Sequence, residues 1–179
     1  EVNTFIYWTA KLPEDVVCQK PLLCILYAWA VLVTDGETRS AREYLSKVTA
    51  KDTHTTGQLK TIQAVLEVFT GNFQEAIELC REALAQLPTD DHFFRIMAAW
   101  NMSGALAVKG EVEAGMTILQ QVVDASIAGE NYLVSVIALC RQGMFHAQMG
   151  NLHQAKDLFE QAINISTTDQ PRPIPAASE

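Results

Sequence analysis

The chain has 179 residues, of which 49% are hydrophobic and 19% charged, and it carries a formal net charge of −8. Such a chain can bury the core of one domain, and an acidic balance without a cluster of Lys or Arg argues against direct contact with nucleic acid. The longest apolar run, from Leu22 to Val33, is too short to cross a bilayer, so we expect no membrane partner.

Apolar residues recur with helical period along the whole chain, which predicts an all-α fold. A short helix is expected over residues 2–10, and Pro13 is expected at the first position of the next helical turn. Four pairs of helices then follow, each joined by a short connection. We expect these pairs at 21–35 with 37–49, 55–70 with 73–87, 90–109 with 112–128, and 131–149 with 152–166.

A glycine inside each pair is followed five residues later by a small residue, and the glycines are 35, 39 and 40 residues apart. The glycine should end the first helix in a left-handed conformation, and the small residue should let two helices cross closely. Residues Asn72, Glu111 and Asn151 should then open and cap the second helix. A repeat of this period predicts an antiparallel helix-hairpin solenoid, a right-handed superhelix with an extended binding surface. The four motifs are Gly36 with Ala41, Gly71 with Ala76, Gly110 with Gly115, and Gly150 with Ala155.

We expect one elongated repeat domain over residues 1–166, with units at about 20–50, 55–88, 90–129 and 131–166. Residues 167–179 contain three prolines and allow two interpretations. They form either a solvated linker or the start of a further repeat, and a cut repeat would expose an apolar edge and permit self-association.

Signals of catalysis, metal binding or cofactor binding are weak, so we expect no enzyme activity and no cofactor. The four histidines lack metal-ligand spacing, and neither GxGxxG nor GxxxxGK[ST] occurs. Adjacent carboxylates at Asp90 and Asp91 are expected to cap a helix rather than act as acid and base. Cys18, Cys24, Cys80 and Cys140 lack CxxC spacing and are expected to be buried, reduced thiols in the cytoplasm.

The first helix of each pair should line the concave side of the solenoid. Positions ten and six residues before each glycine predict an apolar trough there, formed by Leu26, Thr61, Trp100, Cys140, Ala30, Val65, Gly104 and Met144. An alternative remains open, in which Trp100 and Met144 belong to the core between helices and the polar groups face water. The candidate binding residues are Gln58, Arg95, Trp100, Asn101, Arg141, Met144 and Gln148.

The glycine and small-residue pattern, with Ala83 and Ala162 twelve residues after their glycines, resembles the tetratricopeptide repeat. A narrower resemblance is to the helical-repeat region of MalT-like, LuxR-type large ATP-binding transcriptional regulators. It is carried, in this order, by W-T-A-K-L-P-E-D-V-V (8–17), K-P-L-L-C-I-L-Y-A-W-A (20–30), L-P-x-D-D-x-F-x-R (87–95) and P-R-P-I-P-A-A (171–177).

This resemblance implies a cytoplasmic bacterial regulator in which the repeats sense an inducer, while ATP hydrolysis and DNA binding belong to other modules. The expected partner is therefore a small-molecule inducer or a regulatory protein in the concave trough. The alternative is a generic tetratricopeptide-like scaffold that binds the helix or tail of another protein.

Overall fold

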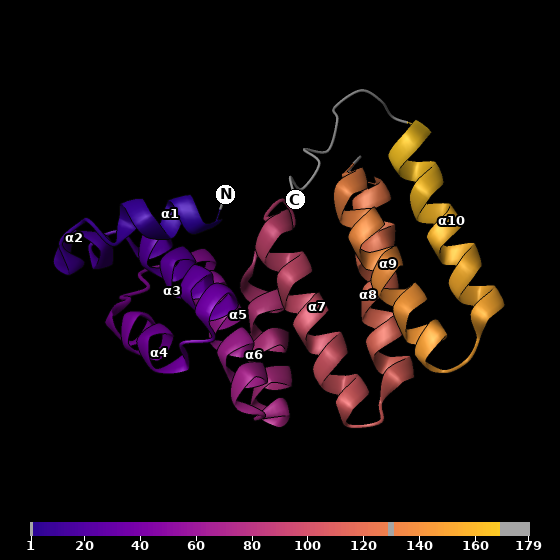
Figure 1. Ribbon diagram of the computed structural model, residues 1–179, viewed down its shortest axis with the longest axis horizontal. Coiled ribbons are helices and arrows are strands. Elements are labelled where there is room, and N and C mark those ends of the chain that lie inside the picture. Colours follow the sequence, from indigo (N-terminus) through magenta and orange to yellow (C-terminus); the bar gives the residue numbers. More distant parts are fainter. Residues whose placement is uncertain (1, 129–130, 169–179) are drawn as a thin grey trace. The chain divides into compact units, whose positions relative to one another are not determined.

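The structure is a computed structural model that describes residues 2–128 and 131–168 (Figure 1). Ten α-helices and no strand occur within these ranges, so the all-α prediction is confirmed. None of the described helices is long and apolar enough to cross a membrane. In chain order the helices are α1 (Val2–Thr9), α2 (Glu14–Cys18), α3 (Pro21–Asp35), α4 (Thr38–Lys47), α5 (Thr53–Thr70), α6 (Phe73–Gln86), α7 (His92–Val108), α8 (Val112–Ala128), α9 (Tyr132–Gln148) and α10 (Leu152–Thr168).

The expected helix pairs match α3 to α10, with ends that differ by a few residues. Pro13 was predicted as the first residue of a helix, but it occupies the N-cap of α2 with a ψ of 139°, and the helix begins one position later at Glu14. The last helix continues to Thr168, so residue 167 belongs to α10 and not to a tail. The rest of the proline-rich segment, residues 169–179, lies outside the described residues.

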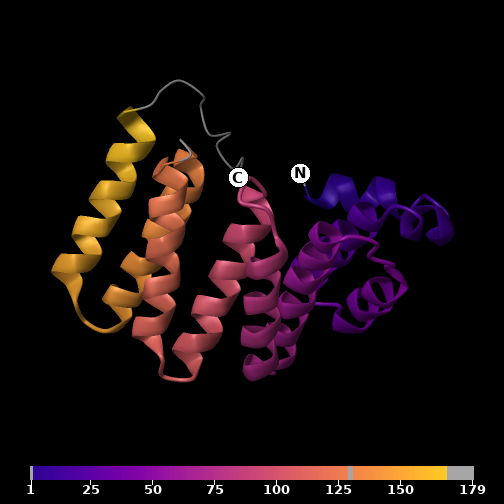
Figure 2. The ribbon, with the colours of Figure 1, turned by 180° about the vertical axis from the view of Figure 1, so that it is seen from behind.

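The chain divides into two compact units, Glu1–Gly115 and Met116–Glu179. In the first unit, α5 packs against both α3 and α7, which places the first helices of three successive hairpins in one row. Helix α4 packs on α3 and α5, and α6 packs on α5 and α7, so the second helices form another layer. The short helices α1 and α2 pack on α3 (Figures 1 and 2).

In the second unit α9 packs along α10, and the two helices lie side by side in both ribbon views (Figures 1 and 2). A Cβ at Gly143 would lie 2.6 Å from the ring of Phe159, so this ring fills the space that a side chain at residue 143 would occupy. The Gln142 amide of α9 donates to the Met116 carbonyl, 3.2 Å away on α8. Ser126 and Ser135 also join α8 to α9 through a buried hydroxyl pair 2.7 Å apart.

The four repeated glycines have φ values of 68°, 82°, 85° and 82°, which confirms the predicted left-handed turns. At Gly71, the amide of the glycine donates to Val68 O and the next amide, that of Asn72, donates to Glu67 O. This pair of bonds satisfies carbonyls at the end of α5, and the same pattern follows Gly110 and Gly150.

The small residues of the motif are buried where helices cross. Ala41 and Ala76 are fully buried, Ala155 is 3% exposed, and Gly115 is also buried. Their predicted place in the packing is therefore confirmed. The predicted side-chain cap at Asn72 is wrong, because its amide donates back to Glu67 Oε2, 2.6 Å away, and does not cap α6.

A second repeated feature begins the first helix of three hairpins. Side-chain oxygens of Asp52, Asp91 and Asn131 accept hydrogen bonds from the backbone amide three residues later, at 2.7, 3.2 and 3.4 Å. These N-caps are 39 and 40 residues apart, the same intervals as the later glycines. Each of these three helices thus begins with a side-chain cap and ends near a glycine turn, which fixes the register of the hairpins.

Candidate functional site

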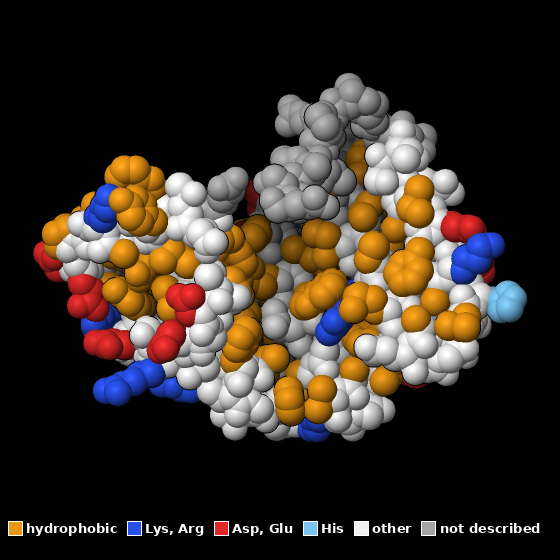
Figure 3. Space-filling view, viewed as in Figure 1, with side chains coloured by type: hydrophobic (Ala, Val, Ile, Leu, Met, Phe, Trp, Pro, Cys, Tyr) orange, Lys and Arg blue, Asp and Glu red, His pale blue; other side chains and the backbone are white. Residues whose placement is uncertain are grey.

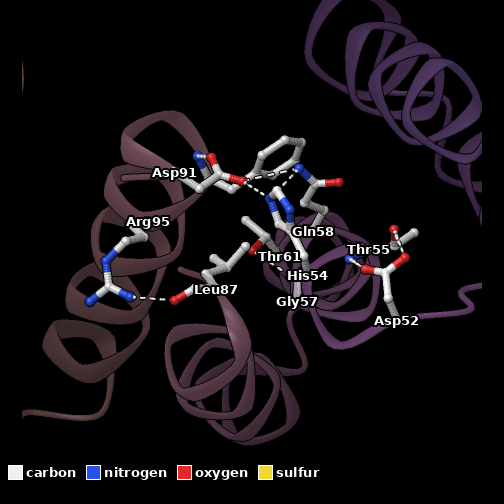
Figure 4. A network of polar contacts seen from close by, with 10 residues as sticks. Asp52, His54, Thr55, Gly57, Gln58, Thr61, Leu87, Asp91 and Arg95 are labelled. Carbon is white, nitrogen blue, oxygen red and sulfur yellow. Dashed lines mark hydrogen bonds and ion pairs between the residues drawn. The ribbon is translucent and has the colours of Figure 1, made fainter. Parts of the chain in front are cut away.

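The polar cluster drawn in Figure 4 joins the beginning of α5 to the beginning of α7. His54 Nε2 lies 2.6 Å from Asp91 Oδ2, and Gln58 Nε2 lies 3.0 Å from the same oxygen. A carboxylate only accepts hydrogen bonds, so the imidazole must carry its proton on Nε2 to make this contact. The Gln58 amide then donates to the carboxylate, although it is also 2.9 Å from the imidazole nitrogen.

Asp91 is therefore the centre of the cluster, because its other oxygen caps α7 at the Phe94 amide. Its side chain is only 11% exposed. Burial by itself would raise the pKa of this carboxyl group, but the hydrogen bonds from His54, Gln58 and the Phe94 amide outweigh burial and lower the pKa. The sequence predicted that Asp91 caps a helix, which is confirmed, but not that it also holds α5.

The His54–Asp91 pair resembles half of a catalytic triad, but its surroundings favour a structural role. Side-chain exposure of His54 is 48%, so this pair is open to water on the His54 side. The imidazole nitrogen that faces the carboxylate already donates its proton to Asp91. Within the part of the chain that the structure describes, no group of three or more His, Cys, Asp or Glu could hold a metal ion. The arrangement ties two helices together.

Arg95, a predicted binding residue, lies one turn after Asp91 on α7 and points at the end of α6 (Figure 4). Its guanidinium donates to Leu84 O at 3.1 Å and to Leu87 O at 2.9 Å. These carbonyls belong to the C-terminal end of α6, where no intrahelical partner remains. One guanidinium nitrogen of Arg95 therefore fixes the connection between α6 and α7.

The other predicted residues of the first unit lie further along α7 and are half-buried. Trp100 and Asn101 lie two turns beyond Phe93, which is 46% exposed, and Val108 at the end of the helix is 63% exposed. The Asn101 amide donates to Met97 O, 2.8 Å away on its own helix. The exposed stripe on α7, with Phe93 and Val108 at its ends and half-buried Trp100 between them, is thus mostly apolar.

The predicted trough is wrong at the middle of α5 and at Ala30, because Ala30, Thr61 and Val65 are buried core residues. Trp29 of α3 and Phe93 of α7 lie on the helices that flank α5. Their rings meet edge to face at 5.8 Å, although α5 lies between the two helices that carry them. At Ala30, Thr61 and Val65 the surface that the sequence predicted to be open is part of the core.

In the second unit, Arg141, Met144 and Gln148 share one side of α9 by their spacing of three and seven residues. Arg141 is half-buried with its guanidinium 4.9 Å from the Phe145 ring, and burial lowers its pKa. Met144 and Gln148 are exposed. Hydrophobic side chains gather over α9 and α10 on the face in Figure 3.

A cavity of about 240 Å³ lies beside α4, α5 and α6, and the sequence did not predict it. Arg42 and Glu67 are paired at 3.1 Å in its wall. Burial opposes ionisation of Glu67, but hydrogen bonds from Asn72, Thr70 and Arg42 lower its pKa. The pair therefore stays charged and links α4 to the end of α5. The remaining lining residues are Leu45, Ser46, Gln63, Leu66, Glu75 and Leu79.

Antiparallel hairpins with left-handed glycine turns and small residues at their crossings define a helical-repeat protein of the tetratricopeptide type. The family model described as the MalT-like TPR region matches residues 57–178. The chain therefore belongs to the MalT-like TPR region family.

Two similar proteins are HTH-type transcriptional regulators called MalT. The chain is 23% identical over 160 residues to the regulator of Klebsiella pneumoniae subsp. pneumoniae, covering 87% of this chain and 18% of that protein. It is 24% identical over 161 residues to that of Yersinia enterocolitica, covering 86% of this chain and 18% of that protein. The chain thus spans about a fifth of the length of these relatives.

Among solved structures, the crystal structure of MamA has a TM-score of 0.58 and 15% sequence identity, covering 86% of this chain and 84% of that chain. This likeness concerns the fold, and it agrees with the stacked hairpins described above.

Proposed function

We propose that this repeat region is the sensor module of a bacterial MalT-type transcription regulator. The observation that carries the proposal is the match of residues 57–178 to the MalT-like TPR region. In this proposal the module binds an inducer and has no catalytic activity of its own. Nucleotide hydrolysis and DNA binding are functions of other parts of the regulator, which acts in the cytoplasm.

The surface we propose for the inducer in the first unit is the exposed stripe of α7. It includes Phe93 and Val108 at its ends and half-buried Trp100 near its middle. An apolar stripe gives binding energy through burial, and a few polar groups fix the orientation of a ligand. Asn101 is the polar side chain of this stripe that a ligand could reach by giving up a bond within its own helix. Arg95 would act indirectly, by holding α7 against the end of α6.

Trp100 provides a direct test of this proposal. A variant with Trp8→Phe and Trp29→Phe leaves Trp100 as the only tryptophan, so its emission reports on α7 alone. Titration with a panel of sugars, nucleotides and other metabolites should find a ligand that shifts this emission. The same ligand should raise the melting temperature, since a ligand at 100 times its Kd stabilises the folded state by about 2.7 kcal/mol.

Asn101→Ala tests the role of this side chain in binding. The amide that it removes donates to Met97 O on the same helix, so the variant breaks no hydrogen bond between helices. It should weaken binding while the melting temperature of the free protein changes little. A panel that moves neither emission nor melting temperature at saturating concentrations removes the support for a small-molecule inducer.

A second candidate function is that of a scaffold for another protein. It is favoured by the large exposed apolar residues of the second unit, Leu133, Leu152 and Ile163, which are 62%, 65% and 59% exposed. A pull-down separates the two functions. A stoichiometric protein partner whose binding is lost in Leu133→Ser supports the scaffold, whereas a small molecule that copurifies with the chain supports the sensor.

A further inference from the structure

The sulfur atoms of Cys18 and Cys24 are 3.2 Å apart. Cys18 is the last residue of α2 and is half-buried, whereas Cys24 lies in the first turn of α3 and is fully buried. Both residues belong to one hydrophobic cluster, which also contains Val17, Tyr27 and Tyr44. The sequence predicted four buried thiols, but Cys18 and Cys140 are half-buried, so for these two cysteines the prediction is wrong.

We propose that Cys18 and Cys24 form a redox modification site, which reacts with peroxides and closes to an intramolecular disulfide. A disulfide requires two sulfurs about 2.05 Å apart, so these atoms need to approach by only about 1 Å. The chain can make this small movement on the side of α2, which has five residues and lies at one end of the first unit. The pair was not recognised in the sequence because its spacing of six residues crosses a helix boundary.

Unequal burial sets the order of the two chemical steps. Cys18 is the accessible thiol, so its thiolate attacks one oxygen of hydrogen peroxide. An S–O bond forms, the O–O bond breaks, and the departing hydroxide becomes water by taking the proton that Cys18 released. Cys18 is then a sulfenic acid.

In the second step the sulfur of Cys24 attacks the sulfur of Cys18. The S–S bond forms, the S–O bond breaks, and the departing hydroxide takes the proton of Cys24 and leaves as water. Burial, followed by the contact with Cys18, raises the pKa of Cys24 to about 12, so this thiol keeps its proton until the second step. Overall, two thiols lose two electrons and two protons, and one peroxide is reduced to two waters.

The reaction would also change the contact between α3 and α4. The Cys24 thiol donates to Tyr44 O at 3.3 Å, and this donor disappears when the sulfur enters a disulfide. Tyr44 also contacts Tyr27 edge to face, with ring centroids 4.9 Å apart. Oxidation would therefore fasten α2 to α3 while it removes one bond between α3 and α4.

The test is to treat the reduced chain with hydrogen peroxide, unfold it, block free thiols with iodoacetamide and map the peptides by mass spectrometry. Pro21 follows Lys20 and prevents tryptic cleavage there, so both cysteines stay in the peptide of residues 12–39. We expect this peptide to lose two hydrogen atoms and to escape alkylation, while Cys80 and Cys140 remain alkylated. A reductant should reverse the change, and the protein should stay monomeric on a non-reducing gel.

Cys18→Ser and Cys140→Ser are matched variants, since both replace a half-buried thiol. Cys18→Ser should leave Cys24 open to alkylation after peroxide treatment, and Cys140→Ser should still form the disulfide. If circular dichroism shows that Cys18→Ser does not fold, Cys24→Ala takes its place, and Cys18 should then stop at sulfenic or sulfinic acid. The proposal is overturned if wild-type Cys18 ends as sulfinic acid with Cys24 alkylated, if the disulfide joins two chains, or if Cys140 is oxidised while the 12–39 peptide stays reduced.

Discussion

Gly115 on α8 lies against the backbone of Ser103 on α7, so closely that a Cβ at residue 115 would be 3.0 Å from Ser103 O and 3.2 Å from its Cα. Backbone atoms cannot rotate away as a flexible side chain can, so any larger residue must push the two segments apart. The other units have alanine at this place in the repeat. The close approach of α8 to the backbone of α7 explains why this unit has glycine.

Gly115→Leu should lower the free energy of unfolding by about 1–3 kcal/mol, because overpacking a close crossing forces backbone shifts. Ala114→Leu is the matched control, since Ala114 is the neighbouring residue on the same helix and is exposed. It should change the free energy of unfolding by less than about 0.5 kcal/mol. Urea unfolding followed by circular dichroism measures both variants, and equal losses would contradict a tight crossing at residue 115.

Gly71→Ala should destabilise the chain by about 1–2 kcal/mol, because a residue with a Cβ must adopt φ near 82° there. No heavy atom lies within 4 Å of the added Cβ, so the cost is conformational and not steric crowding. Gly71→Asn should cost less, since asparagine tolerates the left-handed region. Thermal unfolding of Gly71→Ala and Gly71→Asn tests this prediction. If Gly71→Ala is as stable as wild type, the turn does not need a positive φ at residue 71.

Asp91→Ala should cost about 1–3 kcal/mol, because it removes the cap of α7 and leaves the buried Gln58 amide without its acceptor. Asp90→Ala is the control, as Asp90 is exposed and adjacent. It should have almost no effect in the same urea titration. If the two variants lose the same amount, Asp91 is not the link between α5 and α7.

The lowered pKa of Asp91 also predicts how stability depends on pH. A carboxyl group with a folded-state pKa below its ordinary value of 3.8 stabilises the fold above that value. This contribution is lost as the pH falls through the lower folded-state pKa. The difference in unfolding free energy between wild type and Asp91→Asn should therefore shrink as the pH falls below about 4.

Gln58→Met serves as a second measurement of the same effect, because it removes one donor to the carboxylate while keeping a side chain of similar length. The free energy of unfolding of Gln58→Met should therefore depend less strongly on pH than that of wild type. If the difference in unfolding free energy between wild type and Asp91→Asn instead grows as the pH falls, the pKa of Asp91 is not lowered in the folded state.

The repeat in the sequence predicted the helix pairs, the four glycine turns and the buried small residues, because each depends on local geometry within one hairpin. The His54–Asp91 contact was not predicted, since the two residues are 37 positions apart and meet only when α5 packs on α7. One available signal was missed. Asp52, Asp91 and Asn131 recur at the same interval as the glycines, and together they mark the beginnings of three helices.

The trough was predicted from positions at fixed distances before each glycine, which assumes that every hairpin presents the same side to solvent. This assumption fails for Thr61 and Val65, which are buried. The burial of these two residues depends on how α3 and α7 pack against α5. The sequence of a single hairpin does not determine this packing.

The contact between Trp29 and Phe93 has a consequence for how the first unit unfolds. Arrays of hairpins are commonly treated as one-dimensional chains, in which each repeat gains stability only from the repeats next to it. Here the rings join the first hairpin to the third, past the one between them. Loss of the first hairpin would then weaken the third directly, so melting should spread over longer distances than a nearest-neighbour description allows.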